Sequence, residues 1–153
     1  MITAYRICQR RFVKNALDGD GARLHGGRWN SPGTRVVYLA GSVSLAQLEM
    51  LVHLESDEVL HARYVVIPIG IPSKHVLALP REKWPRGWRA PSAPSATKRI
   101  GDEWVSSGTS LCLQVPSVLV PEEPNFIINP AHPAFADLQI GKAQSLVFDR
   151  RLA

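Results

Sequence analysis

Short apolar runs rich in β-branched residues recur along the chain, separated by glycine, proline and polar turn residues. Runs of this length and composition are typical of β-strands. The run at residues 62–71 contains Pro68, which predicts that this strand ends at a bulge or at the edge of a sheet. We predict strands over residues 3–8, 35–40, 62–71, 110–115, 117–120, 126–128 and 143–148.

Two other segments have a helical pattern. Ser44 and Gln47 have the spacing of a capping box, and residues 45–54 are apolar almost all the way round. Because a helix without a polar side is normally enclosed by protein, we expect this helix to be buried. In residues 95–106, Ile100 and Trp104 have the i, i+4 spacing of residues that face a core.

The order of these elements predicts the fold class. An early strand and helix followed by several short strands indicate an α+β fold, with a twisted, mostly antiparallel sheet and flanking helices. Residues 15–32 are polar and glycine-rich and are expected to form a long loop, but they match neither the Walker pattern nor G-x-G-x-x-G. Residues 80–94 contain four prolines and two tryptophans and are expected to be an ordered loop.

Length and composition indicate one domain with its own core, because the chain has 153 residues of which 45% are hydrophobic. The long apolar stretches fall far short of the roughly 20 residues that cross a bilayer, and the start of the chain lacks the apolar centre of a secretory signal. We therefore expect a cytoplasmic protein that does not enter the membrane. Cys8 and Cys112 are expected to be reduced core residues, and the histidine spacing gives no reason to expect a metal.

The formal net charge of +5 indicates an anionic partner or a simple contribution to solubility. Three kinds of partner fit: nucleic acid, an anionic small substrate and an acidic protein. The cationic residues are dispersed along the chain, which weakens the case for direct binding of nucleic acid.

Glu49 is the acid within the apolar helix candidate. At 100° per residue its side chain projects between Leu45 and Val52, inside the apolar arc. Burying a carboxylate costs several kcal/mol unless it is paired. The position therefore indicates either a structural partner in the core or a function that requires a shielded carboxylate.

Several segments together closely resemble the RES domain, a family named for an arginine, a glutamate and a serine. The matching positions are Arg28, Glu49 and Ser117, and the resemblance spans nearly the whole chain. His25 stands where a tyrosine is expected before the paired glycines, so no stacking role is carried over to it. The segments are 21–34 (GARLHGGRWNSPGT), 37–38 (VY), 44–49 (SLAQLE), 115–117 (VPS), 125–133 (NFIINPAHP) and 148–152 (FDRRL).

The resemblance implies a single RES domain over residues 1–153 with a fold similar to ADP-ribosyltransferases, in which NAD+ lies in the cleft of a split β-sheet. Members of the family are toxins that degrade NAD+ by hydrolysis or phosphorolysis, or transfer ADP-ribose to a target protein. An Xre-like antitoxin keeps them inactive in a heteromeric complex. NAD+ is thus the expected substrate and no metal is implied.

Site roles follow from this chemistry. Glu49 is expected to stabilise an oxocarbenium-like transition state and to orient the nucleophile. Arg28 is expected to bind the pyrophosphate through its planar fork, with Arg6 as a second candidate that has the alternative of pairing with Asp149.

Three further residues are candidates for the NAD+ site, each with a plainer alternative. Tyr38 either stacks on the nicotinamide or is a core residue of its strand. Ser117 either contacts the ribose or the carboxamide, orders Glu49, or is a turn residue beside Pro116. Asn125 is either a ligand contact or a turn residue.

Rival functions remain open at this point. His53 near Glu49 fits an RNA-acting toxin, and a core role for Glu49 fits a binding module without enzymatic activity. A serine hydrolase at Ser117 is disfavoured, because the chain lacks G-x-S-x-G around this residue.

Overall fold

The computed structural model describes residues 1–54 and 61–152. In this part of the chain the strands form one sheet in the order β4-β5-β6-β2-β1-β3-β7, and β8 also pairs with β3. Neighbouring strands are antiparallel except β4 and β5. The predicted α+β class with a mostly antiparallel sheet is confirmed. The strands are β1 Ile2–Gln9, β2 Val37–Ala40, β3 Tyr64–Ile71, β4 Val76–Ala78, β5 Cys112–Pro116, β6 Pro124–Ile128, β7 Gln139–Ile140 and β8 Gln144–Leu146.

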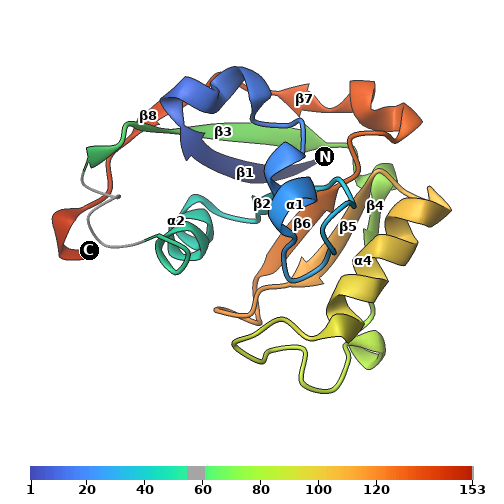
Figure 1. Ribbon diagram of the computed structural model, residues 1–153. Helices are drawn as coiled ribbons and strands as arrows, with labels where there is room; N and C mark the ends of the chain where they lie inside the picture. The colour runs from blue at the N-terminus through green and yellow to red at the C-terminus, as the bar shows by residue number, and fades with distance from the viewer. Residues whose placement is uncertain (55–60, 153) are drawn as a thin grey trace.

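Three α-helices and five short 3-10 helices accompany the sheet in the described residues. In Figure 1, α2 and α4 lie on either side of α1. The α-helices are α1 Asp20–His25, α2 Val43–Leu51 and α4 Ser95–Ser107; the 3-10 helices are Arg10–Asn15, Ser73–His75, Arg81–Lys83, Pro133–Asp137 and Arg150–Leu152.

The sheet splits between β1 and β2. These strands share one pair of facing residues, Tyr5 and Ala40, whereas β1 pairs with β3 along its full length. Figure 1 shows β1 and β3 crossing the upper part of the molecule, while β5 and β6 run steeply below them. Arg6 bridges the split, because its Nη1 donates to the Tyr38 carbonyl oxygen at 3.3 Å. This hydrogen bond joins β1 to β2 where the two strands diverge.

The two faces of the sheet have different coverings. On one face Ala4, Leu39 and Phe126 belong to a core that packs against the 3-10 helix Arg10–Asn15. The opposite face carries two smaller cores, one around Leu45 of α2 and one that contains Trp29 and Trp104. Alternation along β2 and β6 places Tyr38 and Asn125 on this second face. The candidate site therefore lies on the face that α2 and α4 cover.

The prediction for Pro68 is wrong, because β3 neither bulges nor ends at this residue. The strand pairs with β1 from Tyr64 to Ile71 without interruption. On its other side β8 pairs with Tyr64–Val66, and β7 pairs with Ile69 and Gly70. Pro68 lies between these two short partners, where its missing N–H breaks no ladder.

Helix α2 also differs from the prediction. Its N-cap is Ser42, whose Oγ accepts from Leu45 N at 3.1 Å, so the Ser44–Gln47 capping box is not formed. The helix is not buried all round, since Leu48 and Val52 are 42% and 57% exposed. It packs on the sheet with one side alone, and its other side presents apolar groups to solvent.

Two predictions for other segments need correction. Residues 117–120 form a turn instead of a strand, because Ser117 Oγ accepts from Leu119 N and Val120 N and so closes the backbone on itself. The glycine-rich region 15–32 contains a short helix, α1, whose sequence has no apolar periodicity that would reveal it.

Other predictions are confirmed. The second helix is present as α4, with Trp104 only 6% exposed. Cys8 and Cys112 are buried free thiols.

Strands β4 and β7 were not predicted, because each is too short to show a period. Within the described ranges, no helix has both the length and the apolar character needed to span a membrane.

Gly101 determines how closely α4 approaches the loop before β2. A Cβ added at Gly101 would lie 1.5 Å from the Trp29 carbonyl oxygen. We expect Gly101→Ala to lower the free energy of unfolding by about 3 kcal/mol in urea denaturation, since the backbone has to move apart. Gly21→Ala is the control, because nothing lies within 4 Å of its added Cβ and alanine favours α1. Equal midpoints for the two variants would contradict this packing.

Candidate functional site

The Glu49 carboxylate is held by two side chains from other elements. Ser117 Oγ donates to Glu49 Oε1 at 2.8 Å, and Asn125 Nδ2 donates to the same oxygen at 2.8 Å. Ser117 directly follows β5 and Asn125 lies in β6. Both donors bind Oε1, and Oε2 has no hydrogen bond to any described residue. The acid expected to be functional is therefore fixed through one oxygen.

Ser117 has no hydrogen-bonding capacity left for a substrate. Its side chain is fully buried. A hydroxyl has one proton and two lone pairs. The lone pairs accept from Leu119 N at 3.1 Å and Val120 N at 3.2 Å, so the proton points to Glu49. This arrangement favours the ordering of Glu49 over a ribose contact, and it leaves Ser117 Oγ no free lone pair with which to act as a nucleophile.

Arg28 lies in a tight turn that Gly27 and Asn30 close. Gly27 N donates to the Asn30 carbonyl oxygen at 3.0 Å. The guanidinium of Arg28 donates to the carbonyl oxygens of Trp88 at 2.9 Å and Pro91 at 3.3 Å. These acceptors belong to the proline-rich loop 80–94. Two of the five donors of the fork are thus used to hold it in place, and the others remain for a ligand.

Tyr38 and Asn30 fix the conformation of this turn. Tyr38 Oη donates to Asn30 Oδ1 at 2.6 Å and accepts from Trp29 N at 3.0 Å. Asn30 is fully buried, and its Nδ2 donates to backbone carbonyls, including that of Ala22 at 2.8 Å. A Cβ at Gly27 would lie 2.6 Å from Tyr38 Oη, so glycine is needed there. Burial raises the pKa of Tyr38, which keeps the phenol as a neutral donor.

Helix α4 anchors the same turn from the other side. Lys98 Nζ donates to the Gly27 carbonyl oxygen at 2.7 Å, and Asp102 Oδ1 accepts from Ser31 N at 2.9 Å. Burial raises the pKa of Asp102, but hydrogen bonds from Ser31 and Thr34 and the charge of Lys98 outweigh it and lower the pKa. The carboxylate form is therefore favoured, and it holds the Arg28 loop on α4.

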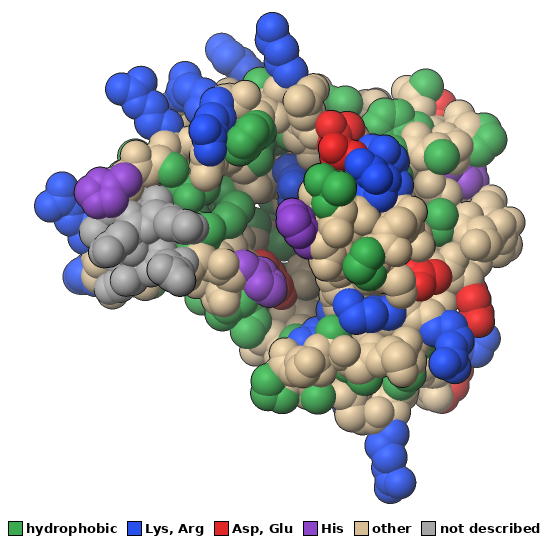
Figure 2. Space-filling view, in the orientation of Figure 1, with side chains coloured by type: hydrophobic (Ala, Val, Ile, Leu, Met, Phe, Trp, Pro, Cys, Tyr) green, Lys and Arg blue, Asp and Glu red, His purple; other side chains and the backbone are tan. Residues whose placement is uncertain are grey.

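The charge of Glu49 acts on Arg28, although the two side chains form no ion pair. Burial lowers the pKa of Arg28, and the charge of Glu49 acts in the opposite direction. No ion pair joins these two residues. Figure 2 shows this face hollowed near its centre, where basic, acidic and histidine side chains gather. A cation and an anion that do not neutralise each other suit a ligand that carries both charges.

Arg6 is placed apart from this group. Along β1 it shares a face with Ala4 and Cys8, and it donates to the carbonyl oxygens of Ala16 and Tyr38 in the split of the sheet. Burial lowers its pKa. The suggested pairing with Asp149 is not formed, since Asp149 binds Arg151. Arg6 reaches the Arg28 loop through the Tyr38 backbone alone.

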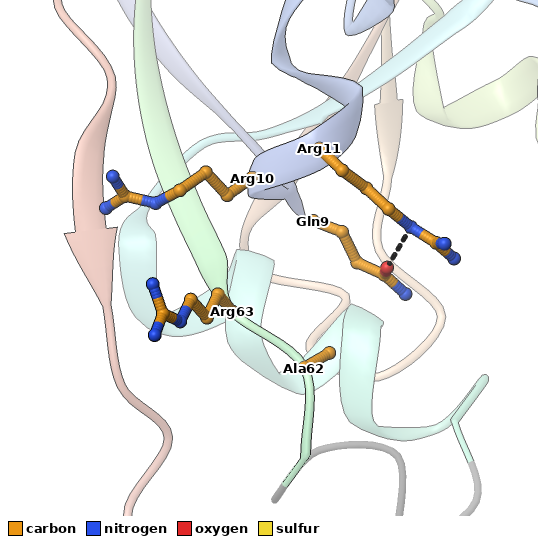
Figure 3. Close-up of a pocket in the computed structure, with 5 residues that line it drawn as sticks. All are labelled: Gln9, Arg10, Arg11, Ala62 and Arg63. Atoms are coloured by element: carbon orange, nitrogen blue, oxygen red, sulfur yellow. Dashed lines mark hydrogen bonds between the residues drawn. The ribbon is translucent and has the colours of Figure 1, made fainter.

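A separate depression of about 420 Å³ is lined by Gln9, Arg10, Arg11, Ala62 and Arg63. Figure 3 shows Arg10 and Arg63 pointing to one side, while Arg11 points to the other and binds Gln9 at 2.9 Å. It contains none of the residues that surround Glu49. Across residues 1–54 and 61–152, no group of three metal-ligating side chains is close enough to hold an ion.

The structure assigns supporting roles to residues that the sequence did not single out. Asn30, Lys98 and Asp102 hold the Arg28 loop, and the carbonyls of Trp88 and Pro91 hold its guanidinium. In the sequence, only the position of Asn30 among glycines hinted at such a role. Lys98 and Asp102 gave no hint, because their partners are backbone groups far away in the chain.

Comparison with known proteins identifies the family. The RES domain family model matches residues 3–149, and the chain belongs to this family. The chain is 43% identical over 149 residues to "Toxin Res" of Yersinia enterocolitica, with 97% of each chain covered. It is 38% identical to the "Prs ADP-ribosylating toxin" of Sphingobium, with coverage of 94% of this chain and 90% of that one.

A solved structure shares the fold. The M. tuberculosis MbcT-MbcA toxin-antitoxin complex contains a chain that matches with a TM-score of 0.78 and 21% identity, over 95% of this chain and 84% of that one. The resemblance found in the sequence is therefore confirmed by the family match and by the fold.

We expect Tyr38→Phe to lower the free energy of unfolding by about 1–3 kcal/mol, because it leaves Trp29 N and Asn30 Oδ1 without their buried partner. Tyr5→Phe is the matched control, since the Tyr5 hydroxyl makes no hydrogen bond in the described part of the chain. Urea denaturation of both variants gives the comparison. Equal stability of the two variants would show that the Tyr38 hydroxyl does not hold the turn.

Proposed function

We propose that this protein is the toxin of a toxin-antitoxin pair and that it cleaves the nicotinamide N-glycosidic bond of NAD+. The observation that carries the proposal is a carboxylate, Glu49, held through one oxygen by two neutral donors, Ser117 and Asn125. The curated relatives named as toxins support the wider role.

The reaction needs one carboxylate at the reacting carbon. The bond between the ribose C1 and the nicotinamide nitrogen breaks, and its electron pair leaves on the nicotinamide, which departs neutral and needs no proton. Positive charge develops on the ribose, and Glu49 stabilises it. The acceptor oxygen then forms a bond to C1 and gives up its proton, which Glu49 is suited to accept.

The remaining residues orient the substrate. Arg28 keeps free donors for the pyrophosphate, and its position is set by the Trp88 and Pro91 carbonyls. Arg6 stays the second candidate for the phosphates, and it would have to leave its bonds to the Ala16 and Tyr38 carbonyl oxygens to reach them. The ring of Tyr38 provides an aromatic face for the nicotinamide, while its hydroxyl holds the Arg28 turn. NAD+ is the substrate in this scheme, and no step uses a metal.

Three acceptors are compatible with this chemistry. Water gives ADP-ribose, phosphate gives the 1-phosphate of ADP-ribose, and a protein side chain gives an ADP-ribosylated target. We take depletion of NAD+ by hydrolysis or phosphorolysis as the main proposal. Transfer to a protein is the second candidate, and the relative named "Prs ADP-ribosylating toxin" favours it.

Replacement of Glu49 by Gln is the direct test. The variant keeps the size of the side chain and an oxygen that accepts from Ser117, but it removes the negative charge. We expect nicotinamide release from NAD+ to fall by about 100-fold or more. Glu103→Gln, on the exposed side of α4, is the matched control and should keep full activity.

Product analysis then separates the acceptors. Purified protein is incubated with NAD+ alone, with phosphate, and with cell extract that supplies target proteins. Free ADP-ribose, its 1-phosphate, or label on a protein identifies the reaction. Full turnover by Glu49→Gln, or no nicotinamide in any of the three incubations, would refute the proposed activity.

We also propose that the cognate Xre-like antitoxin covers the outer side of α2. This helix carries Glu49 and exposes Leu48 and, at its C-terminal end, Val52 to solvent. Exposed apolar side chains beside a site are a common mark of a protein interface. The solved MbcT-MbcA complex shows that a protein of this fold assembles with an antitoxin.

Leu48→Glu tests this interface. A charge at the centre of an apolar contact is expected to weaken antitoxin binding by at least about tenfold, measured by isothermal titration calorimetry. Leu77→Glu, on β4 at the far end of the sheet, is the control, because Leu77 is similarly exposed at 48%. Equal loss of affinity in both variants would place the antitoxin elsewhere.

A further inference from the structure

Of the two polar atoms in the Asn125 side chain, one has a hydrogen-bond partner and the other has none among the described residues. Its Nδ2 donates to Glu49 Oε1 at 2.8 Å, whereas its Oδ1 is buried and has no hydrogen-bond partner among the described residues. The opposite orientation of the amide would place two oxygens against each other. The observed orientation therefore follows from the Glu49 carboxylate.

This arrangement costs stability. A buried acceptor without a donor has lost its hydrogen bonds to water and has gained none in the protein. An apolar residue at this position in β6 would avoid the loss. The presence of asparagine at position 125 is therefore explained by the hydrogen bond from its Nδ2 to Glu49, because the residue does not stabilise the core.

Both ligands of Glu49 Oε1 are neutral. Ser117 and Asn125 orient the carboxylate without cancelling its charge, as a lysine or an arginine would do. Among charged and titratable groups, Arg28 is influenced by the charge of Glu49, and His53 follows farther along the chain beyond α2. Beyond the Ser117 turn, Glu123 binds Ser42 and Arg89 binds the Val118 carbonyl, so both are engaged elsewhere.

We propose that Asn125 is a positioning residue that, together with Ser117, occupies Glu49 Oε1 and leaves Oε2 as the oxygen that acts on the substrate. This inference rests on the proposed cleavage of NAD+. It adds that the reaction depends on a neutral donor at position 125, because that donor fixes the direction of Oε2 and preserves the charge of the carboxylate.

The substitution Asn125→Asp makes the role measurable through pH. It would bring a second carboxyl group to the distance at which Nδ2 now binds Oε1, and two carboxylates so close share one proton. With that proton present, the introduced acid donates to Oε1 as the amide does. Without it, the two charges repel and Glu49 loses its orientation.

The experiment measures kcat and KM for nicotinamide release between about pH 5 and 8.5, a range in which a shared carboxyl proton is lost. We expect Asn125→Ala to lower kcat by at least about tenfold at every pH, with a KM within about threefold of the unaltered protein. Asn125→Asp should be as slow as Asn125→Ala at the upper pH and should recover at least about fivefold relative to it at the lower pH. Asn15→Asp, which makes the same amide-to-acid change at an exposed position, should follow the unaltered protein.

Thermal unfolding provides a readout that needs no activity. The shared proton in Asn125→Asp is lost as the pH rises, so its Tm should fall more over the same pH range than that of the unaltered protein. The double variant Glu49→Gln with Asn125→Asp should lose most of this extra fall, because the repelling partner is gone. This comparison identifies Glu49 as the group that position 125 contacts.

The outcomes separate the two proposals. Parallel pH profiles for Asn125→Asp and Asn125→Ala would overturn the positioning role, as would a loss in Asn125→Ala confined to KM. If the unaltered protein releases no nicotinamide, the proposed function fails and the catalytic role of Asn125 fails with it. The unfolding comparison would still decide whether residues 49 and 125 interact.

Discussion

The site requires that one carboxylate be held away from water without being neutralised. A half-buried Glu49 is tolerated because two neutral donors reach its Oε1. Ser117 and Asn125 are eight residues apart in sequence, and the antiparallel pairing of β5 with β6 brings them together, with Val115 opposite Asn125. The register of two strands thus sets the direction of the acid.

Arg28, the cation of the candidate site, is also held in place by hydrogen bonds to uncharged groups. Arg28 projects from a turn fixed by neutral hydrogen bonds of Tyr38 and Asn30, and its guanidinium is oriented by backbone carbonyls. Arg28 and Glu49 do not neutralise each other. Under the proposed function, Arg28 serves the phosphates of NAD+ and Glu49 serves the positive charge that develops on its ribose during cleavage.

The open geometry of the sheet makes room for this arrangement. Because β1 and β2 meet at a single pair of residues, the strands diverge, and Arg6 bonds across the gap. Helix α2 then packs on the sheet with Leu45 and leaves Leu48 exposed. In the two proposals, the helix that bears the acid is also the one whose exposed apolar side binds the antitoxin.

Local patterns and matched positions in the sequence were enough to predict the α+β class, the strand and helix that lead to Glu49 and, through the RES motifs, the family; they also singled out Arg28 and Ser117 as candidates. Other features became visible only in the folded chain: Pro68 lies inside a strand, α2 is half exposed, and Asn125 and Ser117 share one oxygen of Glu49. These features depend on strand pairing and on contacts between segments distant in the chain, which no local pattern of hydrophobic and polar residues encodes.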